Sequence, residues 1–169
     1  FAQKVRKPMK TLLKSYIVAA FTASILFLSS CDKNSNPDPC DNIACNSGIC
    51  SDGTCICDQY FEGSNCDIQF RDKFLGTWAG SAVCGSSGNS SYSITITAGN
   101  DVALVSIDNI KNSGQTAYGS ATSSTGIVVS EQVINGSRVT ATVLLENGIL
   151  TVRTYENSGD YCTFTGIKQ

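Results

Sequence analysis

The chain has 169 residues, of which 41% are hydrophobic, enough for one domain of about 150 residues or for two smaller ones. It contains no histidine, so the commonest general base and the commonest metal ligand are both missing. The formal charge of −2 conceals an acidic body, because seven basic residues accompany fourteen acidic ones from Cys31 onward, which argues against nucleic-acid binding.

The first thirty residues are typical of an export signal. From Met9 the chain carries lysines, then an apolar run over 16–28, then small residues. A run of this length is short for a membrane span, which needs about 20 residues, but it suits the core of a signal peptide. We therefore expect a helical signal peptide over 9–30, with a buried core helix as the alternative. Residues 1–8 are expected to be an artefact translated upstream of the true start at Met9.

The apolar run ends in Leu28-Ser29-Ser30-Cys31, which resembles the lipobox of bacterial lipoproteins. The resemblance implies that the signal peptide is cut before Cys31 and that this cysteine carries a lipid. More than one acyl chain is enough for stable membrane anchoring. The alternative, a disulfide at Cys31, would leave another of the nine cysteines unpaired.

Residues 31–39 are expected to be the lipidated cysteine and a polar linker, reading "CDKNSNPDP". A charged segment directly after the lipidated cysteine is common in lipoproteins of the Bacteroidota, where it accompanies sorting to the outer leaflet. This resemblance implies an exported protein that is anchored to the outer membrane and exposed at the cell surface.

Six cysteines crowd into the next segment in the pattern C-x4-C-x4-C-x4-C-x-C-x8-C. Such crowding predicts a disulfide framework in an oxidising compartment, although spacing alone leaves about fifteen pairings open. The stretch "CICDQYFEGSNC" resembles the closing half of an EGF-like domain, with Tyr60, Phe61 and Gly63 at its typical positions. The resemblance implies an EGF-like domain over 40–69 with the pairs Cys40–Cys50, Cys45–Cys55 and Cys57–Cys66.

We also expect a hairpin turn at Asp52-Gly53 and a positive φ at Gly63. No metal or cofactor is expected in this module. Calcium-binding EGF domains have an acidic pattern before the first cysteine, where this chain offers only Asp38 between two prolines. The module can serve as a binding surface or as a structural spacer.

Residues 70–169 alternate apolar and polar side chains over short runs, which predicts antiparallel strands. "RDKF" is expected to form one helical turn. The expected strands are 76–84, 90–98, 102–108, 116–121, 126–133, 137–145, 149–156 and 160–168.

Turn residues fix the expected register of the last three strands. A two-residue turn at Asn147-Gly148 sets Leu145 opposite Leu150 and Val143 opposite Val152. A three-residue loop over 157–159, with Gly159 left-handed, then keeps Phe164 on the same inward face. The same alternation places Cys84 and Cys162 inward at neighbouring strand ends. A bond between them fits an eight-stranded up-and-down barrel, and this register sets Lys168 across from Trp78.

"FLGTW" resembles the Gly-x-Trp motif that opens the first strand of lipocalin-like (calycin) barrels, where the tryptophan plugs the base under a basic residue. The resemblance implies that Trp78 and Lys168 form the barrel base. Because the domain is short and its turns are tight, a small or filled interior is expected. Similar short barrels occur in Bacteroidota lipoproteins.

Two functional hypotheses remain, and neither is an enzyme, because histidine, a free thiol and a G-x-S-x-G motif are all missing from the sequence. The first is a surface lipoprotein that binds an unknown protein or glycan partner. The second is a carrier of a small apolar ligand, which needs an open cavity of about 300 Å³ or more. A candidate pocket mouth consists of Tyr92, Ser130, Gln132 and Thr154. The alternative is that these four are ordinary polar residues of a barrel and line no pocket.

Overall fold

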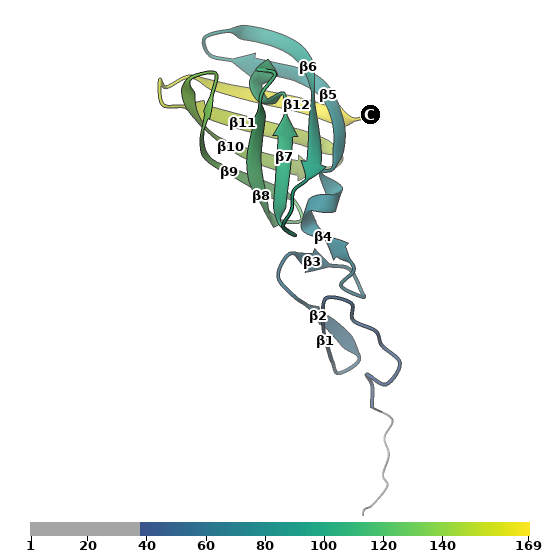
Figure 1. Ribbon diagram of the computed structural model, residues 1–169. Coiled ribbons are helices and arrows are strands. Elements are labelled where there is room, and N and C mark those ends of the chain that lie inside the picture. The colour runs from purple at the N-terminus through teal and green to yellow at the C-terminus, as the bar shows by residue number, and fades with distance from the viewer. Residues whose placement is uncertain (1–37) are drawn as a thin grey trace, which may run out of the picture. The chain divides into compact units, whose positions relative to one another are not determined.

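The computed structural model describes residues 38–169, which form an all-β protein, as expected (Figure 1). The expected upstream segment at 1–8, the signal peptide at 9–30, the lipidated Cys31 and most of the linker lie outside the described residues. Among the described residues, no helix is long and apolar enough to cross a membrane.

Residues 40–69, the disulfide-rich module, contain two short hairpins. β1 (Gly48–Ser51) pairs with β2 (Thr54–Cys57) through a turn in which Asp52 and Gly53 both have positive φ, of 48° and 80°. β3 (Phe61–Glu62) pairs with β4 (Ile68–Gln69). Gly63 has a φ of 94°, which glycine adopts without strain.

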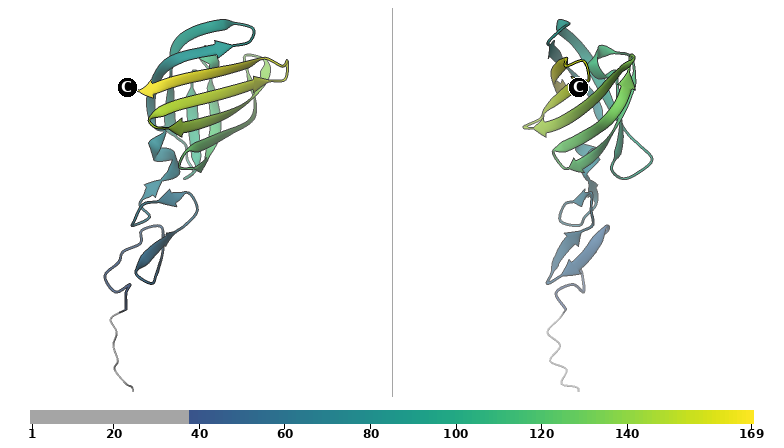
Figure 2. Two further views of the ribbon diagram at one scale, coloured as in Figure 1. Left: turned by 180° about the vertical axis from the view of Figure 1, so that it is seen from behind. Right: turned by 90° about the vertical axis from the view of Figure 1, so that its left-hand side faces the viewer.

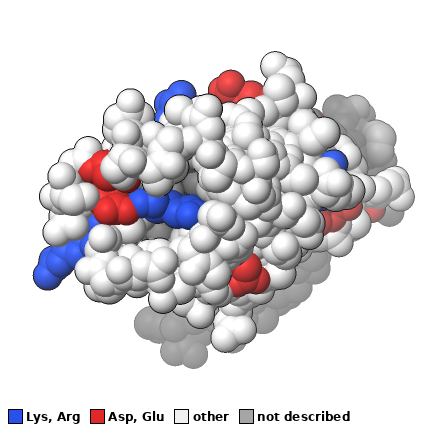
Figure 3. Space-filling model, turned by 90° about the horizontal axis from the view of Figure 1, so that it is seen from above, with Lys and Arg blue, Asp and Glu red and all other residues white. Residues whose placement is uncertain are grey.

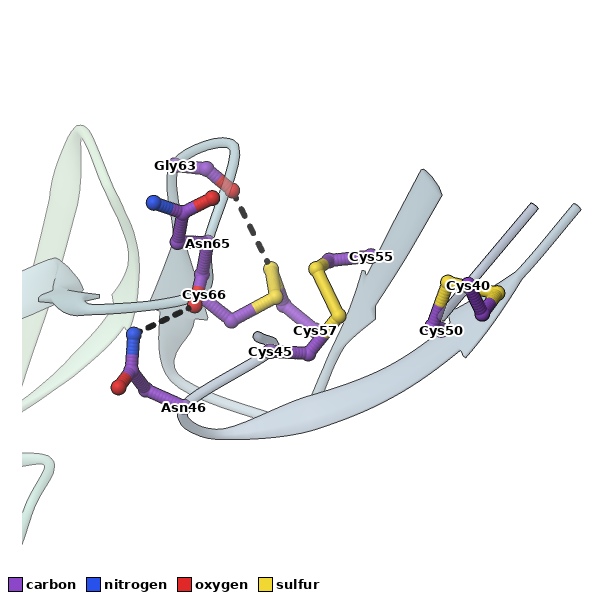
Figure 4. Close-up of a disulfide and its surroundings, with 9 residues drawn as sticks. All are labelled: Cys40, Cys45, Asn46, Cys50, Cys55, Cys57, Gly63, Asn65 and Cys66. Carbon is purple, nitrogen blue, oxygen red and sulfur yellow. Dashed lines mark hydrogen bonds between the residues drawn. A yellow bond between two sulfur atoms is a disulfide. The ribbon is translucent and has the colours of Figure 1, made fainter. Parts of the chain in front are cut away.

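Three disulfides cross-link the module in the pairs expected from the sequence: Cys40–Cys50, Cys45–Cys55 and Cys57–Cys66 (Figure 4). The Asn46 side chain and backbone also donate to the Asn65 carbonyl, at 3.1 and 2.9 Å, beside the last of these bonds. The module is therefore held by covalent links and a few backbone contacts.

Eight antiparallel strands form a closed up-and-down barrel, as Figures 1 and 2 show. Each strand pairs with its neighbours in sequence, and the last strand pairs with the first. A short 3-10 helix, η2 (Phe70–Lys73), precedes the barrel and begins one residue before the turn expected at "RDKF". The strands are β5 (Gly76–Cys84), β6 (Gly88–Ala98), β7 (Leu104–Asp108), β8 (Thr116–Ser123), β9 (Gly126–Ile134), β10 (Ser137–Glu146), β11 (Ile149–Glu156) and β12 (Tyr161–Lys168).

The expected register of the last three strands is confirmed. Leu145 pairs with Leu150 and Val143 with Val152 across the turn at Asn147 and Gly148, which both have positive φ. Val152 pairs with Phe164, so the loop over 157–159 has the expected three residues. Because the side chains of these pairs are largely inward and buried, this register places one face of each strand in the core.

β7 begins two residues later than expected, because Asp101 stabilises a turn instead. Its Oδ1 accepts a hydrogen bond from the Ala103 N–H at 3.1 Å, and its backbone carbonyl accepts one from the Leu104 N–H. Gly99 also donates to the Leu104 carbonyl at 2.8 Å. These local bonds occupy the backbone groups that a longer strand would use in its ladder.

The barrel closes between β12 and β5, where Cys162 pairs with Cys84 and Lys168 pairs with Trp78. The two cysteines form a disulfide with a Cα–Cα distance of 4.0 Å. At the other end of the same seam, the Lys168 ammonium lies 5.7 Å from the centre of the Trp78 ring. The seam is thus fastened at one end by a covalent bond and at the other by a cation–π contact.

Candidate functional site

The interior of the barrel is filled by side chains. Tyr92 and Thr154, two of the residues expected to line a pocket mouth, lie there among buried neighbours. The space left has a volume of about 10 Å³, close to the size of one water molecule. It is bounded by Tyr92, Ile94, Ile110, Lys111, Val152, Thr154, Cys162 and Phe164.

Tyr92 and Thr154 act as packing residues in this interior. The Tyr92 ring lies 5.0 Å from the Phe164 ring, centre to centre, in a tilted arrangement. Burial raises the pKa of the Tyr92 hydroxyl to about 12, so the group stays protonated at physiological pH. The Thr154 hydroxyl donates to the Cys162 carbonyl at 3.5 Å. Both side chains are therefore part of the packing that leaves about 10 Å³ in the interior.

One end of the barrel is covered by a 3-10 segment, η3 (Ile110–Asn112), in a stretch where the sequence predicts neither a strand nor a helix. The Ile110 side chain is 1% exposed and belongs to the core. Asn109 holds the segment, since its Nδ2 donates to the Ser93 carbonyl at 2.9 Å and its Oδ1 accepts from Gly114 N–H at 3.0 Å. The asparagines of "DNIKNSG" are the sequence signal for this turn, because asparagine tolerates positive φ.

An ion pair between Lys111 and Glu156 lies at the same end of the barrel. Their side chains are only 13% and 16% exposed. The two residues lie on segments far apart in sequence, so only the closed barrel shows that they meet. The ion pair lies at the end of the filled interior.

Above this pair is an open polar depression, here called the mouth, with a volume of about 560 Å³. In Figure 3, acidic and basic side chains gather beside a hollow on this face. A hydrogen bond from the Ser86 side chain lowers the pKa of Asp160, and the backbone N–H of Ser86 also donates to its Oδ1 at 3.0 Å. The mouth is lined by Gly85, Ser86, Ser87, Lys111, Glu156, Ser158, Gly159, Asp160 and Tyr161.

Of the other two expected pocket residues, Ser130 is exposed on the outer wall of the barrel, so the expectation for Ser130 was wrong. Gln132 is half-buried and pairs with the inward-facing Val139. Val129 pairs with Ala141 and Gln132 pairs with Val139, so β9 carries one more residue than β10 between these pairs. This bulge reverses the in-and-out alternation along β9 and places Ser130 on the outer surface.

The Gln132 side chain bonds to β8 at Tyr118, beyond the last ladder pair between β8 and β9, which is Ser120 with Val128. Its Oε1 accepts from the Tyr118 N–H at 2.9 Å, and its Nε2 donates to the Tyr118 carbonyl at 2.5 Å. The Gln132 side chain thus bonds to both the N–H and the carbonyl of Tyr118, which has no ladder pair on β9. The alternation of apolar and polar residues in the sequence does not predict this hydrogen-bonding role of Gln132.

The opposite end of the barrel is closed by η2 and the residues after it. Phe74 is fully buried, and its carbonyl accepts a hydrogen bond from Trp78 Nε1 at 2.7 Å. Arg71 donates from one guanidinium nitrogen to the carbonyls of Gly99, Asp101 and Leu104, which fixes the β6–β7 loop. This end is therefore a packed base, in which Trp78 and Lys168 contribute to stability.

The described residues, 38–169, contain no group of three or more His, Cys, Asp or Glu side chains that could hold a metal ion. No protein-family model matches the chain, and no curated protein matches it at a significant level.

Proposed function

We propose that this chain is an exported lipoprotein, anchored through Cys31 to the outer membrane and displayed at the cell surface, that works as a binding protein. Its motif Leu28-Ser29-Ser30-Cys31 supports the anchor. The four disulfides found among the described residues use eight of the nine cysteines and leave Cys31 available for lipid. Disulfides on this scale agree with folding in an oxidising compartment.

We assign residues 40–69 to the EGF-like class and residues 70–169 to the lipocalin-like class of short barrels. The pairing of first with third, second with fourth and fifth with sixth cysteine supports the first assignment. Closure of eight strands over a tryptophan under a lysine supports the second. The combination resembles surface lipoproteins of the Bacteroidota.

The observation that carries the binding role is the filled barrel. A carrier of small apolar ligands needs a cavity of about 300 Å³ or more, and the space beside Tyr92 and Thr154 has about 10 Å³. Contacts with a partner are therefore made on outer surfaces. The mouth offers one such surface, and the module's hairpin offers another, where the paired Ile49 and Ile56 are 66% and 56% exposed.

Cell fractionation tests the anchor and the display together. In a Bacteroidota host, the full chain should co-purify with outer membranes and react with a membrane-impermeant amine reagent on intact cells. Cys31→Ser should remove the protein from the outer-membrane fraction, whereas Ser29→Ala, which keeps a small residue in the motif, should not. Wild-type protein in the soluble fraction would refute the proposal.

Native mass spectrometry tests the choice of a binding protein over a carrier. The full chain, released from detergent, should carry no apolar small molecule besides its own lipid, because the barrel has no room for one. A ligand that co-purifies in stoichiometric amount, and that is lost in a variant with a bulkier interior such as Ala141→Leu, would restore the carrier hypothesis.

A further inference from the structure

A second depression lies on the outer wall of the barrel, across β7, β8 and β9, and we call it the β8–β9 groove. Its volume of about 390 Å³ falls in the range of sites for small ligands. It is lined by Leu104, Tyr118, Gly119, Ser120, Thr122, Val128 and Ser130.

The groove exists because the two strands separate. Ladder pairing between β8 and β9 runs up to Ser120 and Val128 and stops there, next to the bulge after Val129. The Gln132 side chain then occupies the backbone groups of Tyr118 from one side. Bulges often mark functional positions, and this one replaces a flat sheet surface with a concave one.

The chemistry of the lining is uncharged and amphipathic. Four lining residues carry hydroxyl groups that can donate and accept hydrogen bonds: Tyr118, Ser120, Thr122 and Ser130. Leu104 and Val128 add apolar surface and are 40% and 45% exposed. None of the seven lining residues is charged, although the chain as a whole is acidic.

Tyr118 is the dominant side chain of the groove. It is 61% exposed, so a large part of its ring is available to a ligand, while its backbone is fixed by Gln132. A tyrosine with a fixed backbone and an exposed ring, beside hydroxyl groups, supplies an apolar face for stacking together with polar groups for orientation.

We propose that the β8–β9 groove binds an uncharged oligosaccharide. A sugar ring presents an apolar C–H face, which stacks on the Tyr118 ring, and hydroxyl groups at its edge, which match the serine and threonine hydroxyls. Anionic ligands would need lysine or arginine in the groove, and the lining has neither. The inference deepens the proposed binding role by naming a ligand class, and it does not depend on the lipid anchor.

The test uses the full chain in a zwitterionic detergent without a sugar headgroup. Maltotriose, cellotriose, mannotriose and triacetylchitotriose serve as uncharged probes, with sialyllactose as the charged one. Saturation-transfer NMR detects binding, and titration calorimetry gives the dissociation constant, expected near millimolar (about 4 kcal/mol of binding) because the groove is open.

Three variants assign binding to the groove. Tyr118→Ala should weaken binding of the best uncharged probe roughly tenfold or more, as expected for loss of a central aromatic contact. Tyr118→Phe keeps the ring and should stay within about threefold. Tyr155→Ala removes a tyrosine that is 50% exposed on β11, outside the groove, and should leave affinity unchanged.

Thermal unfolding of each variant shows whether the fold is intact, and Ser130→Trp, which fills the groove from an exposed position, provides an independent second variant. Binding of at least one uncharged probe that falls with both Tyr118→Ala and Ser130→Trp supports the proposal. Failure of all uncharged probes, stronger binding of sialyllactose, or equal loss in Tyr155→Ala would overturn it. These outcomes leave the fractionation of Cys31→Ser untouched, so the two proposals fail separately.

Discussion

The disulfide-rich module and the barrel bury very different amounts of side chain. Within residues 40–69 the one buried residue is Cys66, which is itself part of a disulfide. In the barrel, every strand contributes at least one buried residue to a continuous core. A segment of about thirty residues cannot bury enough apolar surface to offset its chain entropy, so it depends on cross-links that restrict the unfolded state. The barrel is stabilised by its buried core, and its one disulfide is an additional contribution to its stability.

Removal of a module disulfide should produce the largest effect. The double variant Cys57→Ala/Cys66→Ala is expected to unfold the module, since a native disulfide in a small domain contributes about 2–5 kcal/mol and no core replaces it. Hydrogen exchange should show loss of protection in β1 and β2, with protection in the barrel strands unchanged. Retained protection in the module would contradict the account.

Removal of the barrel disulfide should weaken the barrel but leave it folded. Cys84→Ala/Cys162→Ala opens a loop with a sequence separation of 78, which corresponds to about 4 kcal/mol in the chain-entropy treatment. Denaturant titration should give a lower midpoint with a single cooperative transition, because the core remains. A chain without a cooperative transition would show that the core alone is insufficient.

Truncation of apolar residues in the two regions should separate them further. Leu150 is fully buried in the barrel, so Leu150→Ala should cost about 3 kcal/mol through lost burial and an unfilled cavity. Ile49 in the module is 66% exposed, so Ile49→Ala should change stability by less than about 0.5 kcal/mol. Denaturant titration measures the change in the free energy of unfolding for each variant. Similar changes for the two variants would contradict the view that the barrel depends on its core and the module on its disulfides.

A smaller effect than that of Leu150→Ala is expected at the seam between β8 and β9. Gln132→Ala leaves the N–H and carbonyl of Tyr118 without their side-chain partner, which should cost about 1–2 kcal/mol. Faster hydrogen exchange at Tyr118 is the specific measurement. Gln132→Glu keeps an acceptor for the N–H but loses the donor to the carbonyl, so its exchange rate should be intermediate.

Much of this fold is local in origin and could be predicted from the sequence. Turn residues such as Asn147-Gly148 and Gly159 determine loop length, and loop length sets the register that brings Cys84 to Cys162. The alternation of apolar and polar residues along each strand then predicts which side chains face inward. The same register predicts that Trp78 lies opposite Lys168, as the structure has it.

The remaining features depend on contacts between distant segments. The bulge in β9 moved Ser130 to the outer surface and gave Gln132 a role in strand pairing, which strict alternation could not show. The cover formed by η3 and the pair Lys111–Glu156 joins segments 45 residues apart. These are the features that fill the barrel and shape its outer depressions, so the candidate sites were less predictable than the strands.

Intact-mass analysis of the protein extracted from outer membranes tests the central claim most directly, because that claim divides the nine cysteines into one lipidated residue and four disulfide pairs. The mature chain should begin at Cys31, carry the added mass of acyl chains, and react with a thiol reagent only after reduction, at eight cysteines. A mature chain without acyl mass, or with Cys31 in a disulfide, would contradict it.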